Sequence, residues 1–112
     1  MTHPIDALWA RVEARRGADP DESWTARLLA RGPEHAARKF GEEAVEAVVE
    51  AVRGDAEALT AEAADVLYHL LVMLAARGVA PADVYAELDR RAGTSGLAEK
   101  AGRDGAGPPP DA

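Results

Sequence analysis

The sequence predicts an all-α fold, for three reasons. Alanine supplies 26 of the 112 residues, whereas only five residues are aromatic. Alanine has the highest helix propensity, and the aromatic and β-branched residues that favour strands are scarce. Apolar residues recur at spacings of three and four, and no segment alternates apolar with polar residues as a half-buried strand would. Glycine and proline divide this pattern into separate helices.

Two short helices are expected before residue 33. The first is indicated by apolar residues at helical spacing, namely Ile5, Leu8, Trp9 and Val12. Gly17 ends it, because glycine is the usual residue after a helix C-terminus. Ser23 is a favourable N-cap for the second helix, which extends to Gly32.

Two long helices and a final short one follow. Pro33 begins a helix that ends at Gly54, and Asp55 caps the next helix, which extends to Arg77. A connection this short predicts an antiparallel hairpin. Residues 81–92 form the last expected helix. One hairpin with short flanking helices buries little core, so we expect copies of the chain to assemble into a larger helical bundle, as a homodimer or a higher homo-oligomer.

Composition excludes several classes of protein. The net charge of −7 argues against binding to nucleic acid, and the absence of cysteine excludes disulfides and thiolate metal sites. The N-terminus lacks the features of a signal peptide. The most apolar stretch, residues 63–76, is interrupted by Asp65 and His69 and is shorter than the ~20 residues needed to cross a bilayer. A cytoplasmic protein without a membrane segment is expected.

The first long helix carries a dense acidic sector. Within about 100° of the helical wheel lie Lys39, Glu42, Glu43, Glu46 and Glu50. Like charges three or four residues apart disfavour a helix by a few tenths of a kcal/mol, that is about 0.2–0.5 kcal/mol per pair. The sector is therefore either a solvated face or a site for a ligand that offsets the repulsion.

The second long helix is apolar nearly all round, so it is expected to be buried. Glu62, Asp65 and His69 nevertheless lie within about 60° of one another on it. No lysine or arginine occurs between Asp55 and Met73. Buried carboxylates need a cation, although solvation at the edge of a bundle is the alternative. His69 is expected to be a core histidine hydrogen-bonded to a carboxylate, because a di-iron bundle would need Glu-x-x-His pairs on two helices.

The hairpin should bring the two acidic groups together. An E-x-x-E pair, Glu43 and Glu46, would face an E-x-x-D pair, Glu62 and Asp65. Four or five converging carboxylates repel unless a divalent cation binds, and oxygen ligands favour Mg²⁺ or Mn²⁺. Because Mg²⁺ commonly bridges to phosphates, a polyphosphate substrate is expected.

Four segments then resemble one family. They are KFGEEAVE from Lys39, EAADVLYHLLV from Glu62, SWTARL from Ser23 and RRAGTSGLAEKA from Arg90. Together, over about residues 5–103, they resemble the phosphoribosyl-ATP pyrophosphatases of histidine biosynthesis, within the all-α nucleoside-triphosphate pyrophosphatase superfamily. The carboxylate pairs alone identify only the superfamily. The resemblance implies one catalytic domain over residues 1–92 and a family-like segment over 93–103. The glycine- and proline-rich composition of residues 104–112 predicts a disordered tail.

The resemblance also implies an activity and a set of site residues. The activity is Mg²⁺-dependent hydrolysis of phosphoribosyl-ATP to phosphoribosyl-AMP and pyrophosphate, with Mn²⁺ as a substitute for Mg²⁺. The implied metal ligands are Glu43, Glu46, Glu62 and Asp65. Glu42 would bind a further metal or orient the attacking water, and either Glu42 or Glu46 would accept its proton. The implied substrate contacts are Lys39, to phosphate, and Ser23, Thr25 and Arg27.

The sequence departs from the family pattern in places, and two other functions are alternatives to it. Trp24 replaces the family's usual tyrosine and Arg27 its usual lysine. The cyclohydrolase domain that is often fused to this enzyme is missing, so a separate enzyme is expected to take the next step. A house-cleaning pyrophosphatase acting on a nucleotide such as dCTP shares the carboxylate pairs. A non-catalytic helical interaction module with solvated acids is the alternative from another class.

Overall fold

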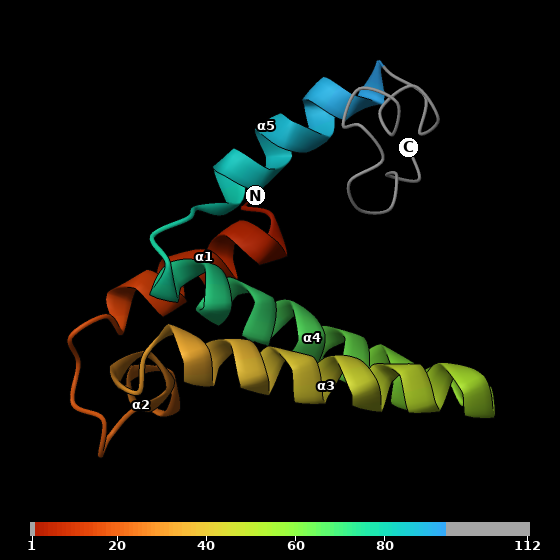
Figure 1. Cartoon of the computed structure of the whole chain (residues 1–112), viewed down its shortest axis with the longest axis horizontal. Helices are drawn as coiled ribbons and strands as arrows, with labels where there is room; N and C mark the ends of the chain where they lie inside the picture. The colour runs from red at the N-terminus through yellow and green to blue at the C-terminus, as the bar shows by residue number, and fades with distance from the viewer. Residues whose placement is uncertain (1, 94–112) are drawn as a thin grey trace. The chain divides into compact units, whose positions relative to one another are not determined.

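The computed structural model describes residues 2–93, and these form five α-helices and no strand (Figure 1). The helices are α1 (Pro4–Ala14), α2 (Trp24–Ala30), α3 (Pro33–Arg53), α4 (Ala56–Ala76) and α5 (Pro81–Ala92). This confirms the predicted all-α class. The chain divides into two compact units, Met1–Val79 and Ala80–Ala112, which we describe separately. The expected tail and all but the first residue of the segment 93–103 lie outside the described residues.

Local hydrogen bonds define the starts of the two short helices. The Nδ1 atom of His3 accepts a hydrogen bond of 3.1 Å from the Ile5 backbone N–H, and Pro4 takes the first position of α1. Ser23 is the N-cap of α2, as predicted, because its Oγ accepts a 3.1 Å hydrogen bond from the Ala26 N–H. Each bond satisfies a backbone donor that the helix itself leaves unpaired.

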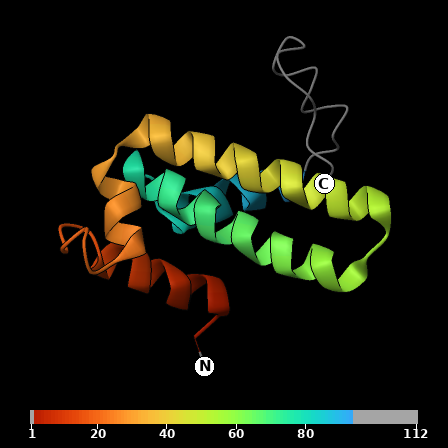
Figure 2. The same cartoon turned by 90° about the horizontal axis from the view of Figure 1, so that it is seen from below.

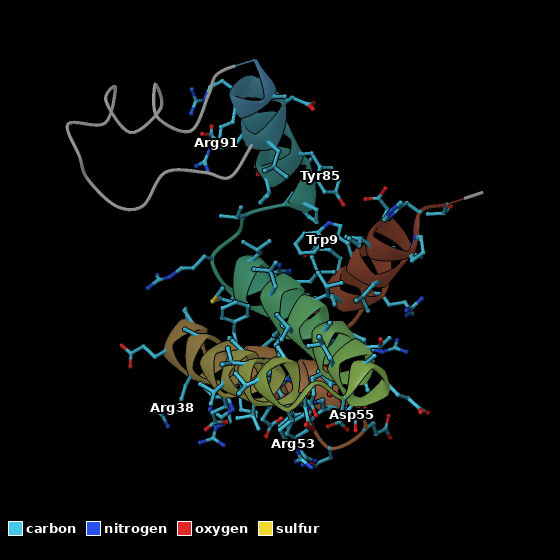
Figure 3. The ribbon with its side chains drawn as sticks, turned by 90° about the vertical axis from the view of Figure 1, so that its right-hand side faces the viewer. Trp9, Arg38, Arg53, Asp55, Tyr85 and Arg91 are labelled. Atoms are coloured by element: carbon cyan, nitrogen blue, oxygen red, sulfur yellow. The ribbon has the colours of Figure 1, made fainter. Side chains whose placement is uncertain are left out.

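The two long helices form the predicted antiparallel hairpin. Gly54 ends α3 with φ of +81°, a left-handed conformation that glycine adopts without steric cost. Asp55 then caps α4, since its Oδ1 accepts a 2.9 Å hydrogen bond from the Ala58 N–H. Figures 1 and 2 show α3 and α4 lying side by side along their length. Arg53 and Asp55 lie at the turn, on the end of the hairpin that faces the viewer in Figure 3.

The core of the first unit lies where α1 and α2 meet the hairpin. Its buried residues come from α1 to α4 and are Val12, Leu28, Ala36, Leu71, Val72 and Ala75. Trp9, labelled in Figure 3, packs against this core and is partly buried. Burial of a side chain the size of leucine or valine stabilises a fold by about 1.5–3 kcal/mol. The end of α4 is thus anchored by α1 and α2 as well as by α3.

The expectation that all of α4 would be buried holds only for its C-terminal half. Within one chain, the buried residues of α4 are His69, Leu71, Val72 and Ala75, while Leu67 is 43% exposed. The reason is geometric, because α1 and α2 cover only the end of the helix. By length and composition alone this 21-residue helix could cross a membrane, a test that the core helices of soluble proteins also pass.

The second unit contains α5, which matches its predicted limits. Its N-terminus is held by a 3.0 Å hydrogen bond from the Ala80 N–H to Asp83 Oδ2. Glu87 pairs with Arg90 at 2.6 Å and with Arg91 at 3.0 Å. Hydrogen bonds from these two guanidinium groups lower the pKa of Glu87 to about 2.

Candidate active site

An acidic cluster forms where α3 and α4 face each other. Glu43 of α3 and Glu62 and Asp65 of α4 each offer a carboxylate oxygen, and these three oxygens lie within 4.8 Å of one another. Glu62 and Asp65 project from the same side of α4 because they are three residues apart. The hairpin brings that side of α4 to face the side of α3 that carries Glu43. The structure thus brings together three of the four predicted metal ligands in the way that the paired motifs predicted.

Glu46, the fourth predicted ligand, lies close enough to Glu43 and Glu62 for its negative charge to raise the pKa of both. For Glu43, partial burial is the larger cause of the raised pKa, and Glu46 adds to it. Burial also raises the pKa of Glu62, followed by the negative charge of Glu46. Without a cation, this cluster therefore retains protons that isolated carboxyl groups would release.

Glu62 supplies the most direct indication of a ligand. Its Oε2 is buried and has no hydrogen-bond partner among the described residues. A buried carboxylate oxygen without a partner is energetically costly, and a bound cation removes that cost. Since every available donor is an oxygen and no cysteine occurs, the donor set fits a hard divalent cation such as Mg²⁺ or Mn²⁺.

Glu42 and Lys39 lie beside the cluster on α3. Glu42 is exposed and is not one of the three residues whose oxygens converge. Its Oε2 lies 3.3 Å from the ammonium group of Lys39, which places a positive charge one turn before Glu43. Glu50 was not assigned to the site from sequence, yet its charge also raises the pKa of Glu62. Glu50 belongs to the acidic sector that the sequence predicts on this helix, and that position could have indicated its place beside the site.

His69 is buried, as predicted, but it does not form the predicted hydrogen bond. Its side chain lies in the core at 7% exposure, and its Nε2 is 3.9 Å from Glu43 Oε1. That separation is too long for a hydrogen bond. Burial lowers the pKa of His69, and the charge of Lys39 lowers it further, so the imidazole is neutral at neutral pH. Its contact with Glu43 is thus between a neutral ring and a carboxyl group.

The three predicted substrate contacts of the SWTARL segment each have a partner within the chain. Ser23 Oγ caps α2, and the hydroxyl of Thr25 lies 2.5 Å from the hydroxyl of Tyr68. Arg27 donates from Nε to the Pro20 carbonyl oxygen at 3.1 Å. The structure therefore shows what holds these side chains, and their contact with substrate stays a prediction.

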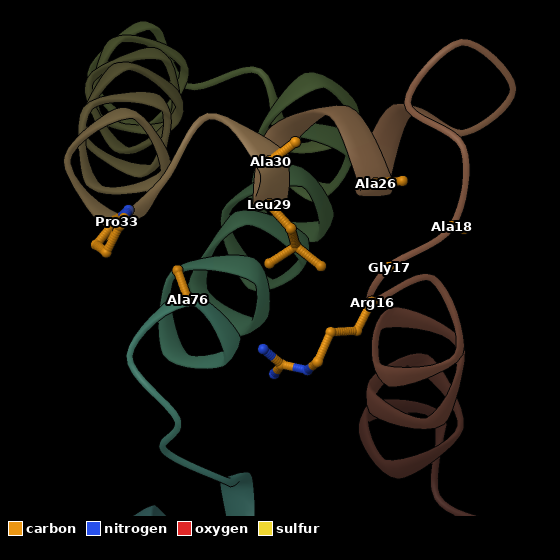
Figure 4. Close-up of a pocket in the computed structure, with 8 residues that line it drawn as sticks. All are labelled: Arg16, Gly17, Ala18, Ala26, Leu29, Ala30, Pro33 and Ala76. Atoms are coloured by element: carbon orange, nitrogen blue, oxygen red, sulfur yellow. The ribbon is translucent and has the colours of Figure 1, made fainter.

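A pocket in the first unit contains none of the predicted site residues (Figure 4). It is lined by Arg16, Gly17, Ala18, Ala26, Leu29, Ala30, Pro33 and Ala76. Its one charged side chain is already engaged, since Arg16 donates to the Ala75 carbonyl oxygen at 3.0 Å and pairs with Glu13 at 2.7 Å. The acidic cluster is therefore the stronger candidate for the active site.

Comparison with known proteins identifies the family. The family described as phosphoribosyl-ATP pyrophosphohydrolase matches residues 5–92, which include the acidic cluster and α2. The chain belongs to this family. Phosphoribosyl-ATP pyrophosphohydrolases break a phosphoanhydride bond, so the chain is a hydrolase, and the resemblance found in its motifs is confirmed.

Similar proteins come from several bacteria, and each is named phosphoribosyl-ATP pyrophosphatase. The protein of Cereibacter sphaeroides (strain ATCC 17025) is 74% identical over 99 residues, which cover 88% of this chain and 96% of that protein. The Dinoroseobacter shibae protein is 71% identical over 96 residues, covering 86% and 94%. The Jannaschia sp. (strain CCS1) protein is 66% identical over 100 residues, covering 89% and 98%. The similarity to each of these relatives thus extends over nearly its whole length.

Proposed function

We propose that this phosphoribosyl-ATP pyrophosphohydrolase cleaves phosphoribosyl-ATP to phosphoribosyl-AMP and pyrophosphate, the second step of histidine biosynthesis, in the cytoplasm. The family match and the names of the relatives support this substrate. The observation that carries the chemistry is the group of carboxylate oxygens of Glu43, Glu62 and Asp65 within 4.8 Å of one another. Such a group can receive a polyphosphate only if cations offset its charge.

Mg²⁺ is the proposed cofactor, with Mn²⁺ as a substitute. Glu43, Glu62 and Asp65 would hold it, together with Glu46, whose charge raises the pKa of Glu43 and Glu62. Bound Mg²⁺ would neutralise charge on the pyrophosphate leaving group and lower the pKa of coordinated water. The buried, unpartnered Oε2 of Glu62 and the all-oxygen donor set fit this ion.

The protein's own residues would orient the substrate and accept the proton of water. The water oxygen forms a bond to one phosphorus of the α–β anhydride, and the bond from that phosphorus to the bridging oxygen breaks. Attack at the α-phosphorus expels pyrophosphate with the bonding electrons, and attack at the β-phosphorus expels phosphoribosyl-AMP with them. A carboxylate, Glu42 or Glu46, would accept the proton that the water releases. Lys39, whose ammonium group lies 3.3 Å from Glu42, would contact a substrate phosphate.

A direct assay tests this function. Pyrophosphate release from phosphoribosyl-ATP should require Mg²⁺ and stop in excess EDTA. The rate with phosphoribosyl-ATP should exceed that with a panel of deoxynucleoside triphosphates including dCTP. A preference for dCTP would favour a house-cleaning pyrophosphatase, and turnover unchanged by EDTA would contradict the proposed metal site.

We also propose that a second copy of the chain covers the exposed apolar surface of the hairpin. On α3 this surface comprises Val45, Val48, Val49 and Val52, of which Val52 is 83% exposed. Leu67 of α4 is also exposed. Several large apolar residues left exposed on one α3 face are typical of an interface. Light scattering coupled to gel filtration should give at least a dimer, and V48K should shift the mass toward the monomer, whereas the exposed-site control E34K should not. A wild-type monomer at micromolar concentration would contradict this proposal.

A further inference from the structure

Two hydroxyl groups join α2 to α4. Thr25 Oγ1 and Tyr68 Oη lie 2.5 Å apart in a partly buried position, at the short end of the range for hydrogen bonds between hydroxyl groups. The two residues are 43 positions apart in the sequence, so only the tertiary fold brings them together. This bond connects the SWTARL segment to the helix that carries Glu62 and Asp65.

His69, the residue after Tyr68, lies close to Glu43 of α3. His69 lies edge-on to the Tyr68 ring, with ring centroids 4.9 Å apart, and its Nε2 is 3.9 Å from Glu43 Oε1. Consecutive helical residues project about 100° apart, so one dipeptide can contact two different helices. Through Tyr68 and His69, α4 therefore contacts both α2 and the acidic cluster.

α2 depends on such contacts for its position. It has only seven residues, and a helix this short is not stable by itself in water. Ala26 and Leu28 bury one side of it in the core. The Thr25 hydroxyl supplies a directional contact, which an apolar surface does not provide.

We propose that Tyr68 is a positioning residue for the hydrolysis of phosphoribosyl-ATP. Its hydroxyl holds Thr25, and thereby orients the segment containing Ser23 and Arg27 with respect to the acidic cluster. On this proposal Thr25 acts through its bond to Tyr68, in place of the substrate contact that the resemblance of the SWTARL segment implied. This inference rests on the proposed function, because it concerns how that substrate is bound.

A double-mutant cycle tests the pair. Tyr68→Phe and Thr25→Val should each raise KM for phosphoribosyl-ATP about 2- to 10-fold, the factor that corresponds to the net contribution of one hydrogen bond. The value of kcat should change less than twofold, because neither hydroxyl touches the reacting atoms. The double variant should be no worse than either single variant, since both remove the same bond. Thr25→Ser, which retains the hydroxyl, should keep the wild-type KM.

Controls separate this inference from the proposed function. Thr60→Val is a matched change in α4, because the Thr60 hydroxyl donates to the Ala56 carbonyl oxygen of its own helix and bonds to no other helix within residues 2–93. It should leave KM and kcat within twofold of the wild-type values. If either Tyr68→Phe or the double variant does not fold, the KM values of Thr25→Val and Thr25→Ser test the proposal instead. A raised KM in Thr25→Val alone supports the positioning role.

Three results would overturn the positioning role while the proposed function stands. They are additive effects on KM, an unchanged KM in Thr25→Val, and a loss of kcat at constant KM. A wild-type protein that does not cleave phosphoribosyl-ATP would overturn the proposed function, and this inference with it.

Discussion

Glu43 and Glu62 lie on opposite helices of the hairpin, yet their carboxylate oxygens approach within 4.8 Å of each other, and the negative charge of Glu46 acts on both. Both glutamates have a raised pKa, chiefly because they are partly buried. This arrangement is unfavourable when all the carboxylates are charged and no cation is bound. It therefore links proton binding, metal binding and the stability of the hairpin.

Replacement of Glu62 by glutamine should separate activity from stability. The amide keeps the shape but removes a charge from the cluster, so the metal-free variant should melt at a higher temperature than the metal-free wild type. Turnover of phosphoribosyl-ATP should fall by about 100-fold or more, since a metal ligand is lost. Glu57→Gln, at an exposed position on the same helix, is the matched control and should retain activity. Full activity in Glu62→Gln would remove this residue from the site.

The contribution of Glu43 and Glu62 to the stability of the metal-free protein should decrease as the pH rises from about 4 toward neutrality. The folded-state pKa values of Glu43 and Glu62 are raised, so the folded state binds more protons than the unfolded state above the ordinary carboxyl pKa of about 4.3. The contribution of these two groups to stability is therefore complete below that pH. It is lost as the pH rises through the raised pKa values of the folded state.

Thermal unfolding in EDTA, from pH 5 to 8, measures this effect. A variant carrying both Glu43→Gln and Glu62→Gln should show a flatter dependence of melting temperature on pH. Saturating Mg²⁺ should offset the loss at neutral pH, because a ligand that binds only the folded state stabilises it. Equal slopes in the wild type and the double variant would show that the acidic cluster does not cause the pH dependence.

Mn²⁺ binding should distinguish an enzyme site from a solvated acidic face. Calorimetric titration should detect binding of Mn²⁺ to the wild type at micromolar to millimolar concentrations, with weaker binding in Asp65→Asn. Binding should also weaken as the pH falls, because protons compete for the same oxygens. Glu57→Gln should bind as the wild type does. The absence of binding to the wild type would favour a helical interaction module.

Leu28→Ala should destabilise the first unit far more than an exposed leucine change would. Leu28 is 1% exposed in the core between α2 and the hairpin. Loss of its side chain should lower the free energy of unfolding by about 2–5 kcal/mol. Leu88→Ala, at 54% exposure on α5, is the comparison and should cost much less. Urea denaturation curves of the two variants measure both effects.

The amino-acid sequence is sufficient to predict the helices and the carboxylate pairs. Helix limits depend on local chemistry: the glycine at position 54 adopts a left-handed conformation, and Ser23 and Asp55 cap helices with their own side chains. The short connection at Gly54 predicts an antiparallel hairpin. Helical spacing then places the E-x-x-E pair opposite the E-x-x-D pair.

How the side chains around these pairs meet depends on contacts between helices. The effect of Glu46 on Glu62, the 3.9 Å separation of His69 from Glu43 and the contact of Thr25 with Tyr68 each involve residues on two different helices. The exposure of Leu67 likewise depends on where α1 and α2 pack. Helical periodicity gives the side of a helix on which a residue lies, but the distance between two side chains also depends on rotamers and on the packing of helices far apart in the sequence.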